Sequence, residues 1–396
     1  MINKKNNWKS AFKNELLLFL AGVALISIGE GIFNSVLNNY LSDAYKISSI
    51  NRTLLEFPRE LPGLLVVLIS SALFFLRSRR LAAFASLLSF LGLTLIALFP
   101  GSFSIFCIWI FIYSTGQHIL IPLSSSISME MAKTGQDGRR LGQVNSVRNL
   151  AIIIGCFIIF IGFHYLNFNY RISFLLAGFA YLLASIYFYF MNPGKIHPVK
   201  QRFKLYKEYR LFYWLSILFG SRKQIFLTFA PWVLVTVYHK PISVIATLLT
   251  LGGITGVLFQ PFLGKMIDRL GEKFILSMEA TIMIVVCFLY GFGKEIFPLD
   301  IAFIVISLCY VTDQLLMSVS MARATYLKKI SLHHDHISPT LTMGVTMDHL
   351  FSIGIAILGG FIWMKFGYQY VFLAGCFISI TTLVSAFWIK THKQYS

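Results

Sequence analysis

The sequence predicts an all-α membrane protein with twelve transmembrane helices in two six-helix bundles. Of its 396 residues, 57% are hydrophobic and 13% are charged, whereas about a quarter of the residues in a soluble domain are charged. The apolar residues gather in about twelve runs, and most of these approach the roughly 20 residues that cross a bilayer. We expect helices because an open sheet edge in lipid leaves backbone groups without hydrogen-bond partners.

The predicted spans follow these apolar runs in chain order. They are 16–38, 52–76, 81–98, 102–130, 142–163, 172–191, 211–237, 243–263, 274–292, 298–326, 341–363 and 370–389.

The basic residues orient these spans. Most of the 34 Lys and Arg residues fall in alternate connecting segments, which are cytoplasmic if the N-terminus is inside. The positive-inside rule then predicts that both termini are cytoplasmic. This topology accounts for the net charge of +18 without a nucleic-acid partner. The opposite side holds few basic residues: Lys46, Arg52, Arg171, Lys240, Lys294 and Lys365.

A basic segment with two prolines divides the chain near its midpoint. Residues 193–209 read NPGKIHPVKQRFKLYKE and separate six predicted spans from the next six. We expect an N-terminal bundle over 1–192, a cytoplasmic linker over 193–209 and a C-terminal bundle over 210–396.

A weak internal repeat supports two equivalent halves. With an offset of 200 residues, the segment around Arg148 falls on the segment around Asp348, in the fifth and eleventh spans. Each segment places a charge about one third of the way into its span, although chance alignment is a competing explanation.

Residues 264–273, GKMIDRLGEK, lie between the eighth and ninth spans. The pattern G-x-x-x-D-R-x-G-x-K resembles the cytoplasmic loop signature of the major facilitator superfamily, a large family of secondary transporters. The resemblance implies two parallel six-helix repeats that rock about a central site. It also implies that Asp268 pairs with a neighbouring helix and stabilises one state of the cycle. The other gating residues that it implies are Gly264 and Gly271, for tight turns, and Arg269 and Lys273, on the basic side of the loop.

Two departures limit the resemblance. The equivalent loop at 73–82, LFFLRSRRLA, lacks the Gly and the Asp, which puts an identical N-terminal latch in doubt. The fifth span has Gly155 and Gly162 but no Pro, and so lacks the Gly-Pro pattern of the family's drug antiporters. This lack weighs against drug efflux.

The first span carries a polar stripe. Glu30, Asn34 and Asn38 are spaced i, i+4, i+8 and therefore share one helix face. A charge at this depth is costly and typically marks a functional site. Glu30 is a candidate proton site and cargo ligand, and the alternative is a structural acid paired with a base.

The seventh span carries Arg222 and Lys223 near the membrane midplane. Two adjacent cations at that depth need anionic partners or an anionic cargo, and Arg suits bidentate recognition of carboxylate or phosphate. In the family plan, spans one and seven are equivalent and line the central cavity. Gln117 and Arg148 complete the predicted substrate-binding residues.

The second span opens with Glu56, Arg59 and Glu60, which can pair on one helix face, and with Pro58 and Pro62. We predict gating roles for Glu56 and Arg59, and also for Asp348 in the eleventh span. The alternative for the second span is a self-neutralised cluster near the outer interface.

Two further groups are candidates for proton coupling. Asp313 is deep and has no obvious local base, and His118 lies mid-membrane and titrates near neutral pH unless perturbed. Three charges nearer the inner face are expected to form interface ion pairs: Glu130, Glu279 and Arg323.

The run His333-His334-Asp335-His336 could ligate a metal, but adjacent residues in a loop rarely close a site alone, so we expect neither metal nor cofactor. The sequence shows no nucleophile motif or phosphate-binding loop, and we do not expect an enzyme.

The sequence therefore predicts a monomeric secondary active transporter, proton-coupled, for a small anionic or zwitterionic solute. It would sit among lipids as a multi-pass protein of the cell membrane, and the compact length favours a bacterial inner membrane. The alternatives are efflux of lipophilic or cationic drugs and, less favoured, a non-transporting membrane sensor or enzyme.

Overall fold

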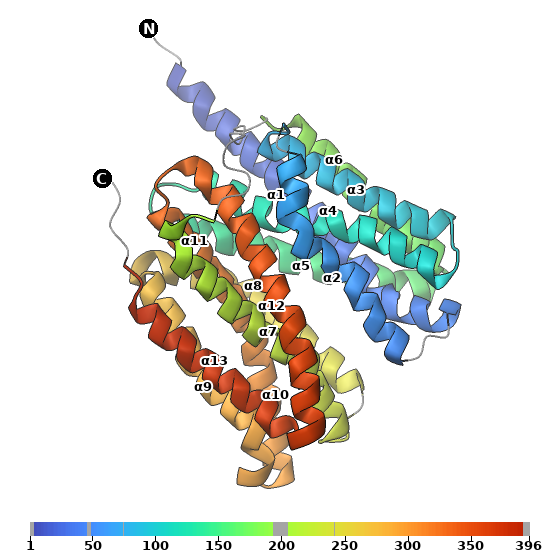
Figure 1. Cartoon of the computed structure of the whole chain (residues 1–396). Coiled ribbons are helices and arrows are strands. Elements are labelled where there is room, and N and C mark those ends of the chain that lie inside the picture. The colour runs from blue at the N-terminus through green and yellow to red at the C-terminus, as the bar shows by residue number, and fades with distance from the viewer. Residues whose placement is uncertain (1–3, 46–48, 74, 193–204, 241, 391–396) are drawn as a thin grey trace. The chain divides into compact units, whose positions relative to one another are not determined.

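The computed structural model describes residues 4–45, 49–73, 75–192, 205–240 and 242–390. Every regular element within these ranges is a helix (Figure 1). Ten of the helical segments are long and apolar enough to cross a membrane. The all-α membrane fold predicted from the sequence is confirmed.

The first six predicted spans each coincide with one helix. They are α1 (Lys4–Tyr45), α2 (Ser49–Ala72), α3 (Ser78–Leu98), α4 (Phe103–Glu130), α5 (Asp137–Tyr165) and α6 (Tyr170–Phe190).

The last six spans follow in the same order, with short 3-10 helices between some of them. They are η2 (Lys207–Tyr209), α7 (Arg210–Thr236), α8 (Ile242–Leu270), α9 (Glu272–Ile296), α10 (Leu299–Leu316), η3 (Met317–Val319), α11 (Ser320–Ile330), η4 (His334–His336), α12 (Ile337–Phe366) and α13 (Tyr368–Phe387).

The tenth span is interrupted, which its apolar composition does not reveal. α10 ends at Leu316, η3 follows directly, and α11 continues to Ile330, so one candidate span covers Leu299–Ile330. A 3-10 stretch inside a longer helix often marks a hinge or a functional site. Asp313 lies one turn before this interruption.

Large apolar side chains cover the outside of the helices. Phe157, Leu258, Phe361 and Phe377 are each more than half exposed. A water-soluble protein rarely exposes so much contiguous apolar surface, and lipid is the solvent in which this surface is stable.

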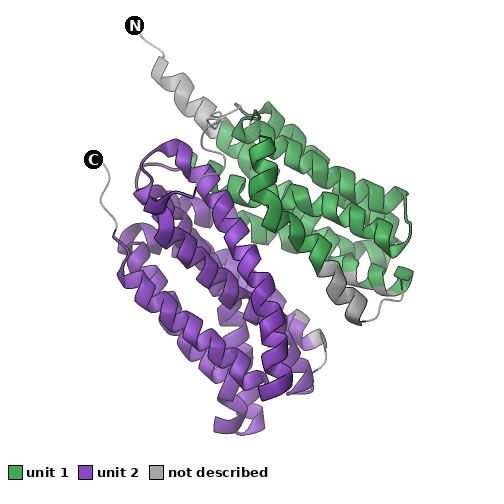
Figure 2. Ribbon diagram, in the orientation of Figure 1, with its two compact units in different colours: residues 1–131, 147–203 green, residues 132–146, 204–396 purple. Residues whose placement is uncertain are grey.

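Packing divides the chain into two compact units (Figure 2). The first comprises Met1–Met131 and Val147–Phe203, and the second comprises Ala132–Ser146 and Lys204–Ser396. The start of α5 thus belongs with the second unit, although the sequence suggests a boundary at the linker. Residues 193–204 of the predicted linker lie outside the described residues, and the predicted domain limits stay a prediction.

In the N-terminal unit, α3 packs against α4 and α6, and α1 packs against α6. Tyr113 of α4 is buried between Phe33 of α1, at 4.4 Å between ring centroids, and Tyr181 of α6, at 5.8 Å. This aromatic cluster holds α1 against α4, with Phe33 one turn beyond Glu30.

In the C-terminal unit, α7 packs against α12 and α13, and α9 packs against α13. Phe226 of α7 lies 5.4 Å from both Tyr290 of α9 and Phe372 of α13, between ring centroids. Arg222 is four residues before Phe226 and therefore shares its helix face. The ring cluster holds that face of α7 against α9.

Candidate functional site

Three deeply buried charges of the C-terminal unit form one ion cluster around Arg222. Its guanidinium donates from Nη1 to Asp313 Oδ1 at 2.6 Å and from Nη2 to Glu279 Oε1 at 3.0 Å. A weak contact from Nη1 to the sulfur of Met283, at 3.6 Å, completes its surroundings. The three charges come from α7, α9 and α10, so packing of three helices assembles the cluster.

The burial of this cluster is nearly complete. The exposed side-chain fractions are 4% for Arg222, 4% for Glu279 and 0% for Asp313. Charges in a low-dielectric interior are stable only when they are paired and hydrogen-bonded. Arg222 satisfies two carboxylates at once and has little surface left for a solute.

Asp313 is only half satisfied. Its Oδ1 accepts from Arg222, while Oδ2 is buried without a hydrogen-bond partner. An unpartnered carboxylate oxygen in a dry interior is costly, and a proton on Asp313 would lower that cost. The geometry therefore suits the predicted proton-coupling residue.

Lys223, the neighbour of Arg222, pairs with a different helix. Its ammonium donates to both carboxylate oxygens of Asp348 on α12, at 2.7 and 3.0 Å. The Ser352 hydroxyl donates to Gly220 of α7 and also lies 3.1 Å from Asp348 Oδ1. Asp348, predicted from the sequence to act in gating, is therefore the direct partner of a predicted cargo residue.

Arg323 on α11 behaves differently from these paired cations. It is buried, and its Cζ lies 3.5 Å from the ring centroid of Phe219 on α7. No carboxylate of the described residues forms an ion pair with it. The expectation that Arg323 forms an interface ion pair is wrong, because the face of an aromatic ring takes the place of the acid.

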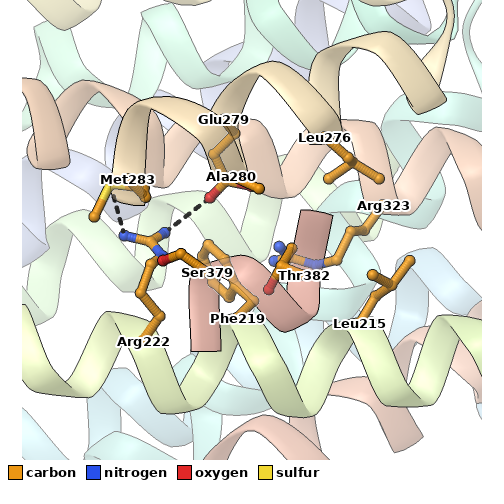
Figure 3. A pocket seen from close by; sticks show the side chains of 10 residues that line it. All are labelled: Leu215, Phe219, Arg222, Leu276, Glu279, Ala280, Met283, Arg323, Ser379 and Thr382. Atoms are coloured by element: carbon orange, nitrogen blue, oxygen red, sulfur yellow. Dashed lines mark hydrogen bonds and ion pairs between the residues drawn. The ribbon is translucent and has the colours of Figure 1, made fainter. Parts of the chain in front are cut away.

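A small cavity lies among these groups (Figure 3). Its volume is about 10 Å³, and its charged lining consists of Arg222, Glu279 and Arg323. Phe219 and Thr382 supply part of its remaining wall. The cavity belongs entirely to the C-terminal unit and is enclosed by α7, α9, α11 and α13.

In the N-terminal unit, the first and fifth spans carry a looser ion pair. Arg148 Nη2 lies 3.7 Å from Glu30 Oε2, and the side chains are 36% and 25% exposed. The backbones of α1 and α5 approach closely beside this pair, since a Cβ on Gly31 would collide with the Ile152 carbonyl. Asn34, one turn further along α1, is exposed. The side chain of Asn38 lies outside the described residues.

Gln117 lies beside the same region. Its amide nitrogen donates to the Tyr181 hydroxyl at 3.1 Å. Tyr181 also packs next to α1, because a Cβ on Gly29 would meet its ring. Gln117 and Glu30 are thus placed around one buried tyrosine, and the structure brings together two predicted binding residues that are distant in sequence.

His118 connects α4 to α2. Its Nδ1 lies 3.0 Å from the Ser114 hydroxyl, and Nε2 lies 4.0 Å from Glu60 Oε2. The Ser114 hydroxyl in turn donates to the Arg59 carbonyl of α2. This carbonyl lies next to the one that Pro62 leaves without its helical donor. The side chain of Glu56 lies outside the described residues.

The Asp268 carboxylate holds the beginning of α5. Its two oxygens accept the backbone N–H groups of Gly138 and Arg139, each at 2.8 Å. These amides lie in the first turn of α5, where helical N–H groups have no partner within the helix. A carboxylate there also interacts favourably with the helix dipole.

The other motif residues adopt roles that differ from the expected loop. α8 continues to Leu270, so Gly264 lies inside a helix rather than in a turn, with its backbone against Gly138. Gly271 alone forms the turn, with φ of +82°. Arg269 is exposed, and the Lys273 ammonium lies 5.6 Å from the ring centroid of Phe387.

Two further ion pairs reinforce this junction. Lys328, near the end of α11, donates to Asp137 at the start of α5, at 2.6 Å. Lys329 beside it pairs with buried Glu272, the first residue of α9. The segment that carries Asp268 is therefore linked to α5 and α11 by charged side chains.

Packing accounts for His336, the last residue of the histidine run. His336 is buried, with Nδ1 2.7 Å from the Tyr209 hydroxyl and its ring stacked on Tyr206 at 4.2 Å between centroids. These contacts fasten the segment before α12 to the start of α7.

A second, larger pocket lies in the N-terminal unit. It measures about 300 Å³ and is lined by α1, α5 and the start of α6. Phe160 and His164 stack at 5.8 Å between centroids, and Tyr170 also lines the pocket. Its lining is largely aromatic and apolar, in contrast to the charged cavity of the C-terminal unit.

Sequence reasoning missed the partners of the deep cations. Glu279 and Arg323 were expected at the inner interface, whereas both line the cavity beside Arg222. Glu130 does form an ion pair, with Arg79 at 2.5 Å. The missed signal is that Glu279 lies seven residues inside α9, among apolar neighbours.

Comparison with known proteins agrees with this architecture. The family model described as Major Facilitator Superfamily matches residues 19–329. No curated protein matches the chain significantly.

Solved structures share the fold at low sequence identity. The transporter FucP in its outward conformation has 13% identity and a TM-score of 0.73, covering 96% of this chain and 100% of that one. The proton:xylose symporter XylE has 13% identity and a TM-score of 0.70, covering 97% of each. The human organic anion transporter MFSD10 has 10% identity and a TM-score of 0.68, covering 95% and 99%.

Proposed function

The chain belongs to the major facilitator superfamily, and we propose that it is a proton-coupled secondary transporter for a small anionic or zwitterionic solute. The observation that carries the proposal is the buried cluster of Arg222, Glu279 and Asp313, in which one carboxylate oxygen has no partner. Ionisable groups within spans typically mark proton or substrate pathways. The neighbours XylE and E. coli FucP, described as proton symporters, support this class of mechanism.

Asp313 is the proposed proton site of the C-terminal unit. When Asp313 is ionised, Arg222 bridges two carboxylates and is held between α9 and α10. A proton on Asp313 weakens its hydrogen bond to Arg222, because a charge-assisted bond is roughly twice as strong as a neutral one. Proton binding would thereby loosen the contact between α7 and α10. Glu30 and His118 are the corresponding candidates of the N-terminal unit.

The proposed solute contacts in the N-terminal unit are Glu30, Asn34, Gln117 and Arg148. The Glu30–Arg148 pair is partly exposed and long, so a solute carrying a carboxylate or an ammonium group can compete for either partner. Arg222 and Lys223 would contact solute only after they release their own carboxylates, and in the described state they act through those partners.

Gating is proposed to involve the motif around Asp268. The hydrogen bonds from the first turn of α5 to Asp268 form a latch that must break if α5 moves away from α8. Arg59, Glu56 and Asp348 remain proposed gating residues, and Asp348 would act through Lys223.

The protein spans a membrane several times. We place it in the cell membrane with both termini cytoplasmic, on the distribution of Lys and Arg in its connecting segments.

A thermal-shift screen followed by flux in proteoliposomes tests the function. Purified protein is screened with carboxylates, phosphates, amino acids and lipophilic cations at acidic and neutral pH. Hits are then assayed for uptake driven by a pH gradient. Gradient-driven uptake that becomes insensitive to the gradient in Asp313→Asn, but not in exposed Asp300→Asn, supports the proposal. Uptake that follows the gradient equally in both variants contradicts a proton role for Asp313.

A second function, efflux of lipophilic compounds, is favoured by one observation. The N-terminal pocket of about 300 Å³ has the size and aromatic lining of a small-molecule site. Stabilisation by lipophilic cations that is lost in Glu30→Gln, without any response to anions, would favour efflux over the leading proposal.

A further inference from the structure

Arg323 is a deep cation whose donors are not used by an acid. It lies in α11 with 8% exposure, whereas Arg222 and Lys223 each bind carboxylates. A guanidinium cannot be deprotonated in a protein, so its charge persists despite burial. Such a group requires compensation from its surroundings.

The ring of Phe219 provides part of that compensation. The Arg323 Cζ lies 3.5 Å from the ring centroid, and the guanidinium of Arg222 lies 5.3 Å from the same ring. Stacking uses the face of a guanidinium, whereas its N–H groups point outward in the plane. Phe219 therefore holds Arg323 in place and leaves its hydrogen-bond donors for an acceptor.

The cavity next to Arg323 is large enough for one small group. Its volume of about 10 Å³ gives room for roughly one water-sized group. Thr382 and Ser379 line it from α13, and Figure 3 shows Arg323 with Thr382 at one end and Arg222 with Glu279 at the other.

The charge distribution selects the end at which an anion would bind. At the Arg222 end, one cation already faces two carboxylates, Glu279 and Asp313, and repels further negative charge. At the other end, Arg323 supplies a positive charge with a nearby hydroxyl. Glu279 and Asp348 attenuate the charge of Arg323 through space but form their ion pairs with Arg222 and Lys223, so Arg323 keeps its donors for another acceptor.

We propose that the Arg323 end of this cavity is a subsite for one small anionic group. The group is either a free halide ion or the carboxylate end of an organic solute, and both would accept hydrogen bonds from the in-plane donors of Arg323. For the organic source, the proposal rests on the transport function proposed above. For a free halide, it stands without that function.

Anion titration of the purified full-length protein tests the subsite. Chloride, bromide, formate and acetate are each titrated against methanesulfonate, a larger anion without a carboxylate, at constant ionic strength, and the unfolding temperature is measured. We expect a saturable rise for the native chain and an affinity at least about tenfold weaker in Arg323→Gln, because charge-assisted hydrogen bonds are lost. Arg171→Gln, at an exposed arginine, should titrate like the native chain.

A milder variant keeps the test valid if Arg323→Gln does not fold. Thr382→Val preserves the volume of the wall and removes only the hydroxyl, and we expect a few-fold weaker anion affinity. A titration unchanged in both variants, or no saturable response to any of the four anions, overturns the subsite and leaves a hydrated cavity.

The titration also separates the two sources of the anion. A response to halides alone assigns a free-ion site, and a response to formate and acetate as well assigns the carboxylate of a solute. Anion binding without any solute flux would keep the subsite and contradict the proposed function. Gradient-driven flux in a protein that binds no anion at Arg323 would keep the proposed function and contradict the subsite.

Discussion

At the residue scale, we expect the removal of Arg222 to destabilise the C-terminal unit by more than its two intact ion pairs stabilise it. A buried ion pair contributes little net stability when intact, because desolvation offsets the attraction between the charges. Removing one partner is costly, since the remaining charge stays buried. Arg222 is the sole ion-pair partner of Glu279 and of Asp313 among the described residues.

We therefore expect Arg222→Met to lower the free energy of unfolding by about 3–5 kcal/mol. The loss should appear in thermal unfolding of the purified protein, and Arg269→Met, at an exposed arginine, is the matched control. Combining Arg222→Met with Glu279→Gln and Asp313→Asn should recover much of the stability, because no uncompensated charge remains. Equal stability of Arg222→Met and the control would show that the cluster is hydrated and weakly coupled.

The sequence shows where these charges lie along the chain but not which charges meet. Arg222 and Lys223 are recognisable as deep because they lie inside an apolar run. Their partners lie 57 to 125 residues away in sequence on helices whose packing no local pattern reveals. Arg323 is misjudged for the same reason, because its neighbour is the ring of Phe219 and not an acid.

At the scale of elements, the junction of α5 and α8 is built on close backbone approach. A Cβ on Gly138 or on Gly264 would meet the carbonyl of the other residue. This proximity brings the first amides of α5 within reach of Asp268. The motif predicts that Asp268 pairs with a neighbouring helix, but it does not reveal that the supposed loop is helical up to Leu270.

We expect Asp268→Asn to reduce solute flux several-fold while the protein still folds. Asn has the same size, but it carries no charge for the helix dipole, worth about 0.3–1 kcal/mol. It also offers one acceptor oxygen where Asp268 offers two to the amides of Gly138 and Arg139. Flux in proteoliposomes and the unfolding temperature are measured together, with Asp300→Asn, at an exposed aspartate, as control. Unaltered flux in Asp268→Asn would exclude a latch at this residue.

At the scale of the whole molecule, the two halves repeat one ion pair with its charges exchanged. Within the N-terminal unit, acidic Glu30 of the first span pairs with basic Arg148 of the fifth. Within the C-terminal unit, basic Lys223 of the seventh span pairs with acidic Asp348 of the eleventh. The 200-residue offset aligns Arg148 with Asp348. In each half, the aligned residue pairs with a charge on the first helix of that half. In each half an ion pair joins the first helix to the fifth, although the acidic and basic residues are exchanged between the halves.

The same repeat requires that corresponding connections lie on the same side of the membrane, which a labelling experiment checks. Exposed Arg171 and Lys294 belong to connections expected outside, and exposed Lys133 and Lys207 to connections expected inside. On intact cells, an impermeant thiol reagent should label Arg171→Cys and Lys294→Cys. It should label Lys133→Cys and Lys207→Cys only after the membrane is opened.

The unsubstituted chain, labelled in parallel, measures the background in this experiment, because Cys107 and Cys156 are not buried. The reverse pattern would place both termini outside and contradict the positive-inside assignment. Labelling of all four positions from outside would contradict an even number of spans on each side of the central linker. The expected pattern agrees with six spans before the linker, because only an even number of spans returns the chain from a cytoplasmic N-terminus to the cytoplasm.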